Sequence, residues 1–233
     1  MNAMRWVGSA KHDSMTPVGR VAMKLVMVAG ISGLVLGLGA CSDLERSRNL
    51  ADPSVPAKAL ALQVCSNCHG IDGNSSSPNF PRLAGQTEEY FTSQMTGFRG
   101  HSRSDPAGFE YMWGLSRHLT DEQIKDLAAY YAGQTPGKLG GANTTPRINA
   151  GKLVYENGLA DKEVPPCSSC HGADGQGNGQ FPRIAGQHAD YLVKQLMVFQ
   201  RTNERPEGSI MKTIAHGLSR ENMEDVAAYL QTR

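Results

Sequence analysis

The sequence predicts an all-α protein made of two tandem domains related by internal duplication. Within the 233 residues, positions 80–86 (FPRLAGQ) return as positions 181–187 (FPRIAGQ). Apolar residues recur at helical spacing in both copies, and no stretch alternates as a half-buried strand would. A unit of about a hundred residues that occurs only twice indicates duplicated domains rather than a solenoid.

The first copy contains a succession of predicted helices. Residues 58–65 are predicted to form a short apolar helix, and the Gly-rich residues 70–73 a loop after it. A second helix is predicted over residues 87–99, which open with a threonine and two glutamates, residue types that favour a helix N-terminus. Residues 120–123 (TDEQ) predict a capping box. The helix that follows it carries an apolar stripe at helical spacing: Ile124, Leu127, Ala128 and Tyr131.

The second copy repeats this order. Residues 150–155 correspond to the first helix, and residues 172–179 form another Gly-rich loop. Residues rich in Gly, Pro and Thr separate the copies, so we expect domains at 57–133 and 148–233 joined by a linker at 134–147. The stripe of the last helix also recurs: Met223, Val226, Ala227 and Leu230.

One short motif stands at the same place in each copy, CSNCH at 65–69 and CSSCH at 167–171. Cys-x-x-Cys-His is the attachment motif of c-type haem. Two thiols three residues apart lie on one side of a helical turn, so both can bond to one flat macrocycle, and the next His then reaches an axial position of the iron. The motifs predict two covalent haem c groups, with attachment and axial residues Cys65, Cys68, His69, Cys167, Cys170 and His171.

A disulfide, a zinc site and a thioredoxin-like redox pair are the alternatives for these cysteines. A structural zinc ion needs four ligands in one place, and each motif offers three. A thioredoxin-like pair is expected near a βαβ pattern, which the sequence lacks. The His that follows the second Cys in both copies favours haem. A buried haem would also supply much of the core that a domain of this size lacks.

The N-terminal segment has the features of a secretory signal. Basic residues precede an uncharged run at 25–42, and small residues precede Cys41. The ending LGAC resembles the bacterial lipobox, in which the cysteine becomes the lipidated first residue. We expect a signal peptide at 1–40, lipidation of Cys41, and a polar tether at 41–56. A retained membrane helix, for which 18 residues is the short limit, and ordinary cleavage to a soluble protein are the alternatives. Lipidation and a retained helix would both tether the protein outside the cytoplasm, in the periplasm.

The charge of residues 41–233 is nearly balanced, with 19 basic and 21 acidic residues and a formal charge of −2. No basic patch suggests nucleic acid as a partner. The sign of the charge is too weak to indicate any other partner.

The second axial ligand separates electron transfer from catalysis, because catalysis needs an open face of the iron. Met112 and Met211 correspond between the copies, each seven residues before a leucine. We predict that both lie in irregular segments and ligate the irons. Within residues 41–233 the other methionines are expected to fill the core: Met95, Met197 and Met223.

The remaining histidines of this part have no His counterpart in the other copy. His101 and His118 are the alternatives to Met112 as an iron ligand. Otherwise surface or loop positions are expected for all four: His101, His118, His188 and His216.

The chain resembles the cytochrome c4 family of dihaem class I c-type cytochromes. Besides the Cys-x-x-Cys-His motifs, residues 79–86 (NFPRLAGQ) and 210–212 (IMK) carry the resemblance. It implies two all-α cytochrome domains packed with approximate two-fold symmetry. It also implies His/Met ligation by the pairs His69/Met112 and His171/Met211. By similarity to class I cytochromes, the carbonyls of Pro81 and Pro182 would accept from the ring N–H of the axial histidines, and Arg82 and Arg183 would face the propionates.

The resemblance implies an electron carrier rather than an enzyme. A membrane-tethered periplasmic carrier would take single electrons from a quinol-oxidising complex or a dehydrogenase and pass them to a terminal oxidase or reductase of the respiratory chain. An electron-accepting subunit of a dehydrogenase complex, as in sulfide-oxidising flavocytochromes, is the second hypothesis. A small haem peroxidase is the third, and the paired methionines argue against the open iron that it needs.

Overall fold

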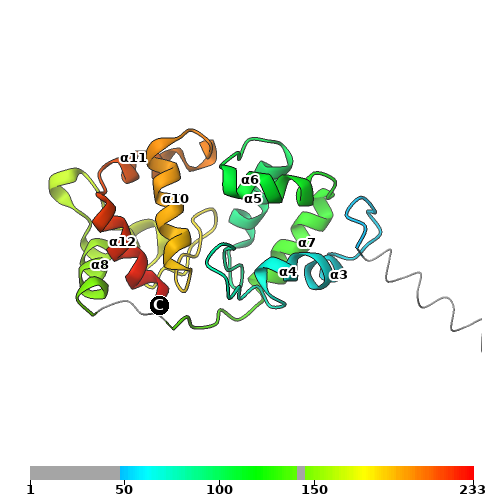
Figure 1. The fold of residues 1–233 in the computed structure, drawn as a ribbon, viewed down its shortest axis with the longest axis horizontal. Helices are drawn as coiled ribbons and strands as arrows, with labels where there is room; N and C mark the ends of the chain where they lie inside the picture. Colours follow the sequence, from blue (N-terminus) through cyan, green and yellow to red (C-terminus); the bar gives the residue numbers. More distant parts are fainter. Residues whose placement is uncertain (1–47, 141–144) are drawn as a thin grey trace, which may run out of the picture. The chain divides into compact units, whose positions relative to one another are not determined.

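The computed structural model describes residues 48–140 and 145–233. Within these ranges the regular structure is helical, and the only β pairing consists of two isolated bridges. The prediction of an all-α fold is therefore confirmed (Figure 1). The predicted signal peptide and Cys41 lie outside the described residues. In the part that is described, no helix has the length and apolar character needed to cross a bilayer.

The N-terminal half begins with an unbroken helical run that ends at the axial-ligand candidate His69. The helix predicted at 58–65 is thus longer, and it carries the whole first motif. Thr120 forms the predicted capping box with Gln123, because its hydroxyl accepts the Gln123 N–H and its own N–H donates to the Gln123 side chain, both at 3.1 Å. The helices of this half are α3 (Ala57–Leu60), the π-helical turn η1 (Ala61–Cys65), α4 (Ser66–His69), α5 (Glu88–Arg99), α6 (Pro106–Ser116) and α7 (Asp121–Ala132).

The C-terminal half has a similar succession of helices, but its first helix ends before the second motif and a 3₁₀ turn separates the two. That helix covers 145–157 rather than the predicted 150–155, because Pro146 is well tolerated in a first turn. Gly158, with φ of +69°, follows its end. The helices are α8 (Thr145–Asn157), the 3₁₀ turn η2 (Ala160–Lys162), α9 (Ser168–His171), α10 (Ala189–Arg201), the 3₁₀ turn η3 (Pro206–Gly208), α11 (Ser209–His216) and α12 (Arg220–Gln231).

The prediction that the two corresponding methionines lie in irregular segments is wrong. Met112 lies on α6 and Met211 on α11. Helix α6 starts at a proline that directly follows Asp105, a favourable first position, and α11 continues directly from a 3₁₀ turn. Helix α6 has 11 residues, but its apolar residues do not gather on one face and two glycines interrupt it, whereas α11 has only 8 residues, so neither shows a clear period in the sequence.

Each half has its own apolar core, and the predicted stripes of α7 and α12 lie in these cores. In the N-terminal half α7 packs against α3 and α5, and in the C-terminal half α12 packs against α8 and α10. Gly151 is the point where α8 meets the backbone of α12, since a Cβ there would lie 1.9 Å from the carbonyl oxygen of Asp225. The C-terminal half therefore depends on a helix crossing that admits no side chain at this position.

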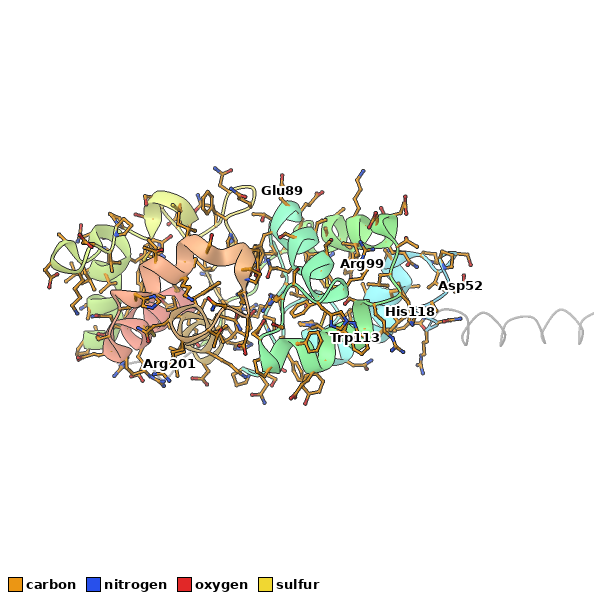
Figure 2. The ribbon with its side chains drawn as sticks, turned by 90° about the horizontal axis from the view of Figure 1, so that it is seen from above. Asp52, Glu89, Arg99, Trp113, His118 and Arg201 are labelled. Carbon is orange, nitrogen blue, oxygen red and sulfur yellow. The ribbon has the colours of Figure 1, made fainter. Side chains whose placement is uncertain are left out.

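Ends of neighbouring helices are also joined by polar contacts. The Arg99 guanidinium, at the end of α5, donates to the carbonyl of Leu119 at 2.8 Å and to Asp121 at 2.5 Å (Figure 2). This joins the C-terminus of α5 to the N-terminus of α7, and it orients the helix that carries the core stripe.

Two glutamines join the halves with approximate two-fold symmetry. The Gln86 amide accepts from the N–H of Arg183 at 2.8 Å and donates to its carbonyl at 3.0 Å. The Gln187 amide makes the same two contacts with Arg82, both at 2.9 Å. Each glutamine thus satisfies both backbone groups of the corresponding arginine in the opposite half, as the resemblance implied for the packing of the domains.

Candidate haem sites

One cavity of about 610 Å³ brings the candidate haem residues of both copies together. Its size is within the range of binding sites for large organic cofactors. Its wall is mainly apolar, as a macrocycle with a hydrophobic body requires. It includes all the predicted attachment and axial residues: Cys65, Cys68, His69, Met112, Cys167, Cys170, His171 and Met211.

The cysteines are half-buried free thiols. Burial raises the pKa of Cys65 to about 11, and it does the same for Cys167. A thioredoxin-like pair works through a thiolate of lowered pKa, so the raised pKa of Cys65 and Cys167 does not favour that alternative. Across the described ranges no group of three or more His, Cys, Asp and Glu side chains is placed to hold a metal ion. The local chemistry therefore fits covalent attachment to a cofactor better than either alternative.

Both motif histidines are buried and oriented by a proline carbonyl. His69 Nδ1 lies 2.8 Å from the Pro81 oxygen, and His171 Nδ1 lies 3.0 Å from the Pro182 oxygen. A carbonyl only accepts, so Nδ1 carries the proton and Nε2 keeps its lone pair. Burial lowers the pKa of each ring, partly offset by the bond to the carbonyl, so both histidines are neutral at pH 7. This is the tautomer that an axial histidine needs.

A phenylalanine packs edge-on against each of these histidines. The ring of Phe80 lies 6.3 Å from that of His69, and the ring of Phe181 lies 6.4 Å from that of His171. Both phenylalanines line the cavity. The repeat contained this pair, but only the structure indicates that it buttresses the histidines.

Two of the three methionines predicted to fill the core stay away from the cavity, and the third also borders it. Met197 does not line the cavity, and Met223 is buried in the second core. Met95 lies in the first core but also borders the cavity. Met112 and Met211 are thus the corresponding pair that reaches the cavity from both halves.

The other histidines do not reach the cavity. His101 is exposed and packs against Phe109 and Trp113, and His118 is exposed as well (Figure 2). His188 lies in the loop that precedes α10, one of the two environments expected for it, but it is buried rather than at the surface, with 5% of the residue exposed. Its Nε2 lies 2.9 Å from the carbonyl oxygen of Ser75, a residue of the opposite half. A contact over 113 positions leaves no local signal in the sequence.

The two arginines expected at the propionates differ in their hydrogen bonding. Arg82 donates to the carbonyl of Gly186 at 3.0 Å and also to the side chain of Asn74. Arg183 is half-buried, and its Nε is a buried donor without a hydrogen-bond partner. Both line the cavity, so Arg183 in particular has a donor to offer to an anionic substituent there.

Sequence reasoning missed a set of polar residues on the cavity wall, all of them buried except Glu207. They come from equivalent places in the two halves: Gln94, Arg103, Asp105, Gln195, Arg205 and Glu207. The repeat of the glutamines was visible in the sequence, but the contacts between the halves were not.

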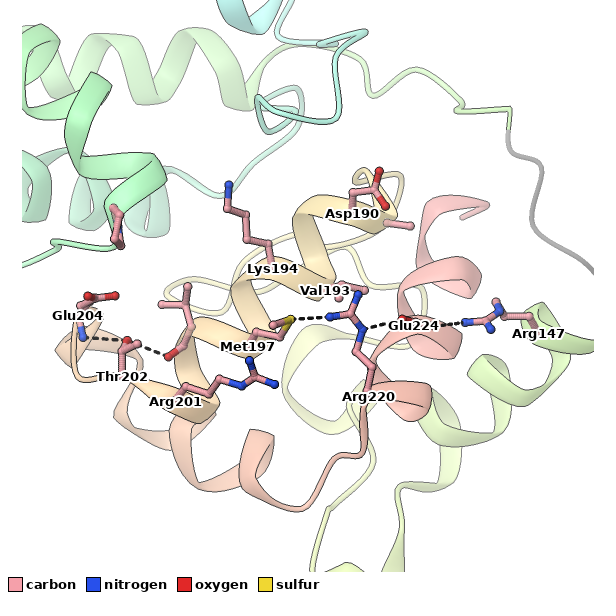
Figure 3. Close-up of a pocket in the computed structure, with 13 residues that line it drawn as sticks. Arg147, Asp190, Val193, Lys194, Met197, Arg201, Thr202, Glu204, Arg220 and Glu224 are labelled. Carbon is pink, nitrogen blue, oxygen red and sulfur yellow. Dashed lines mark hydrogen bonds and ion pairs between the residues drawn. The ribbon is translucent and has the colours of Figure 1, made fainter.

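A second hollow, of about 710 Å³, contains none of the predicted site residues. Cationic and acidic side chains of α8, α10 and α12 line it (Figure 3). Arg220 donates to Glu224 at 2.6 Å, and Arg147 donates to the same carboxylate at 2.8 Å. Glu224 thus joins α8 to the start of α12 at this hollow.

Comparisons with known proteins agree with this site. The profile of the cytochrome c family matches residues 54–133 and 148–233. Cytochrome c4 of Azotobacter vinelandii is 39% identical over 224 residues, which cover 92% of this chain and 99% of that protein. The crystal structure of reduced cytochrome c4 from Pseudomonas stutzeri has a TM-score of 0.68 and 34% identity, covering 78% of this chain and 98% of that chain.

The name of a further relative refers to electron acceptance from an enzyme. The thiosulfate dehydrogenase electron acceptor of Thiomonas intermedia is 29% identical over 170 residues, which cover 71% of this chain and 76% of that protein. This match leaves the assignment unchanged, since most of this chain matches cytochromes c4 at higher identity. The chain therefore belongs to the cytochrome c4 family: it is a dihaem electron-transfer cytochrome with two covalent haem c groups.

Proposed function

We propose that this chain is a membrane-tethered periplasmic carrier whose two irons each have one histidine and one methionine ligand. The axial pairs are His69 with Met112 and His171 with Met211. The thioether bonds form at Cys65, Cys68, Cys167 and Cys170. The observation that carries the proposal is that all eight side chains line one cavity, to which each half contributes two cysteines, one histidine and one methionine.

Bound haem c supplies an iron that changes between the ferrous and ferric states. The residues of the chain set the conditions for that change. The Pro81 and Pro182 carbonyls hold the histidine rings in one orientation and make them more basic ligands. The methionine thioethers favour reduced iron and raise the potential. The apolar wall keeps water from the irons.

Potentiometric titration of methionine variants tests the ligand assignment. Met211→Ala is expected to lower one of two one-electron potentials, because the thioether that favours ferrous iron is lost. Met197→Ala is the matched control, since Met197 lies in the same half and does not line the cavity. Equal potentials in the Met211→Ala and wild-type proteins would refute the assignment, and Met112→Ala tests the N-terminal half in the same way.

The proposed anchor is a lipid on Cys41, followed by the tether at 41–56. The support is the sequence ending LGAC after an apolar run. Cys41→Ser is expected to move the dihaem protein from the membrane fraction into the soluble periplasmic fraction while its haem spectrum stays the same. A variant that remains in the membrane would indicate a retained helix, and a wild-type protein that is already soluble would indicate ordinary cleavage.

The proposed partners are a quinol-oxidising complex or a dehydrogenase as donor and a terminal oxidase or reductase as acceptor. The relative named as a thiosulfate dehydrogenase electron acceptor favours a second candidate, a dedicated electron-accepting subunit of a dehydrogenase. Purification under native conditions distinguishes the two. A stable complex with a dehydrogenase would support the dedicated subunit, whereas a free monomer at micromolar concentration would support the carrier.

A further inference from the structure

A buried tyrosine hydroxyl in the N-terminal half makes no hydrogen bond within the described part of the chain. Tyr131, on α7, is 1% exposed, and its hydroxyl oxygen is buried without a partner. An unpaired buried polar group is unfavourable, because no new contact replaces the water that it has lost. The side chain lines the haem cavity, so a group bound there can supply the missing partner.

The ring of Tyr131 is held by neighbours from three segments. Its centroid lies 5.5 Å from that of Phe91 on α5 and 5.1 Å from that of Tyr130 on α7. Gly73 leaves room for it, since a Cβ there would lie 2.8 Å from Tyr131 Cδ1. The ring cannot turn toward solvent unless these neighbours move, so the hydroxyl stays at the cavity.

Cys65 is the titratable neighbour of this hydroxyl. Burial raises the pKa of Tyr131 well above its ordinary value, and the Cys65 thiol raises it further. The hydroxyl in turn lowers the pKa of Cys65, which only partly offsets the effect of burial on the thiol. The two groups therefore lie beside each other at the cavity wall, and Tyr131 stays protonated at neutral pH with an O–H to donate.

The C-terminal half has a leucine at the equivalent place. The carbonyl of Tyr131 accepts from the N–H of Gly85 at 2.8 Å, and the carbonyl of Leu230 accepts from the N–H of Gly186 at the same distance. Leu230 is also buried and lines the cavity. The two haem sites thus share this backbone arrangement but differ by one hydrogen-bond donor on the wall.

Attachment of haem replaces the S–H bond of Cys65 by an S–C bond, and a thioether sulfur can only accept. We propose that the Tyr131 hydroxyl donates to this sulfur and raises the potential of the N-terminal iron, a contribution that the C-terminal iron lacks. A donor aimed at a substituent of the macrocycle favours ferrous iron, which has one positive charge less than ferric iron. The iron gains one electron, and the hydroxyl keeps its proton throughout. This inference rests on the haem sites of the proposed function.

Redox titration of Tyr131→Phe tests the inference, with each couple assigned to its half from the haem methyl NMR signals. The substitution removes only the hydroxyl. We expect the reduction equilibrium constant of the N-terminal haem to fall at least threefold, about 28 mV for one electron. The constant of the C-terminal haem should stay the same. The unfolding midpoint should also fall, because a paired donor is lost, whereas removal of an unpaired hydroxyl would raise it.

Tyr130→Phe is the matched control on the same helix. Its hydroxyl donates to the carbonyl of Ile71 at 2.8 Å, and Tyr130 does not line the haem cavity. The control therefore removes the same atom together with a hydrogen bond that lies away from the cavity. We expect it to lower the unfolding midpoint and to leave both potentials unchanged.

The inference is overturned if Tyr131→Phe changes the N-terminal potential no more than Tyr130→Phe does, raises it, or changes both potentials alike. An unfolding midpoint that stays the same or rises would also overturn it. These results would leave the proposed function intact. A wild-type protein without two reversible one-electron couples would instead contradict the proposed function itself, so the two failures are distinguishable.

Discussion

Replacing Gly151 by alanine is expected to force apart the helices α8 and α12. A Cβ at this position would lie 1.9 Å from the carbonyl oxygen of Asp225 and 2.4 Å from its carbonyl carbon. Both atoms belong to the backbone of α12, so no side-chain rotation relieves the overlap. The helices must separate along a crossing that is central to the packing of the C-terminal half.

The expected loss of folding free energy follows from this overlap. Ordinary contact begins near 3.4 Å, so the helices must part by about 1.5 Å. Overpacking of a core costs about 1–3 kcal/mol, and the rigid backbone on both sides places this substitution near 3 kcal/mol. This corresponds to a change of about 150-fold in the folding equilibrium. The melting temperature is expected to fall by roughly 6–12 °C for a chain of this length.

Thermal and guanidinium chloride unfolding of the mature dihaem protein, followed by far-UV circular dichroism, measures the loss. Gly114→Ala on α6 is the control, because a Cβ there meets no atom within 4 Å. In that open helical position alanine is expected to add about 0.5–1 kcal/mol. Gly151→Ala within 0.5 kcal/mol of the wild type would refute the reasoning about the helix crossing.

Two further predictions concern caps and pH. Thr120→Ala and Ser219→Ala should each lower the free energy of unfolding by about 1 kcal/mol, because each hydroxyl caps a helix. Thr87→Ala should lose less, since its hydroxyl is buried and makes no hydrogen bond, and equal losses in denaturant titrations would contradict this. Burial lowers the pKa of His188 below its usual 6.5, so the unfolded chain takes up the proton first as the pH falls. The stability that neutral His188 contributes is present above about pH 6.5 and lost below it. His188→Gln should weaken this dependence in unfolding experiments between pH 5 and 8, and an unchanged slope would show that other groups cause it.

The elements with local signals were predictable from the sequence. The haem motifs need only their own five residues, and the capping box at Thr120 needs only four. The stripe on α7 follows from the helical period, and its residues are buried as predicted. The correspondence of the two copies also indicated Met112 and Met211 as a matched pair, and both line the cavity, although the argument from irregular segments was wrong. Helix α11 is too short for a period to show, and α6 lacks a distinct apolar face.

The features that join the halves were not predictable in this way. His188 and Ser75 are 113 positions apart, and neither has a residue pattern that indicates the other. The same holds for Arg103 and Gln195. A repeat reveals which residues correspond, but the pairing of one copy with the other depends on how two folded domains pack.

Carbon monoxide binding to the dithionite-reduced, mature dihaem protein tests the central claim most directly, because carbon monoxide binds ferrous haem only at an open or labile sixth position. The Soret band reports the binding. The proposed ligation by His69/Met112 and His171/Met211 predicts no change of this band on addition of the gas. A shift from one or both haems would show an iron that lacks a firm second protein ligand and would contradict the account.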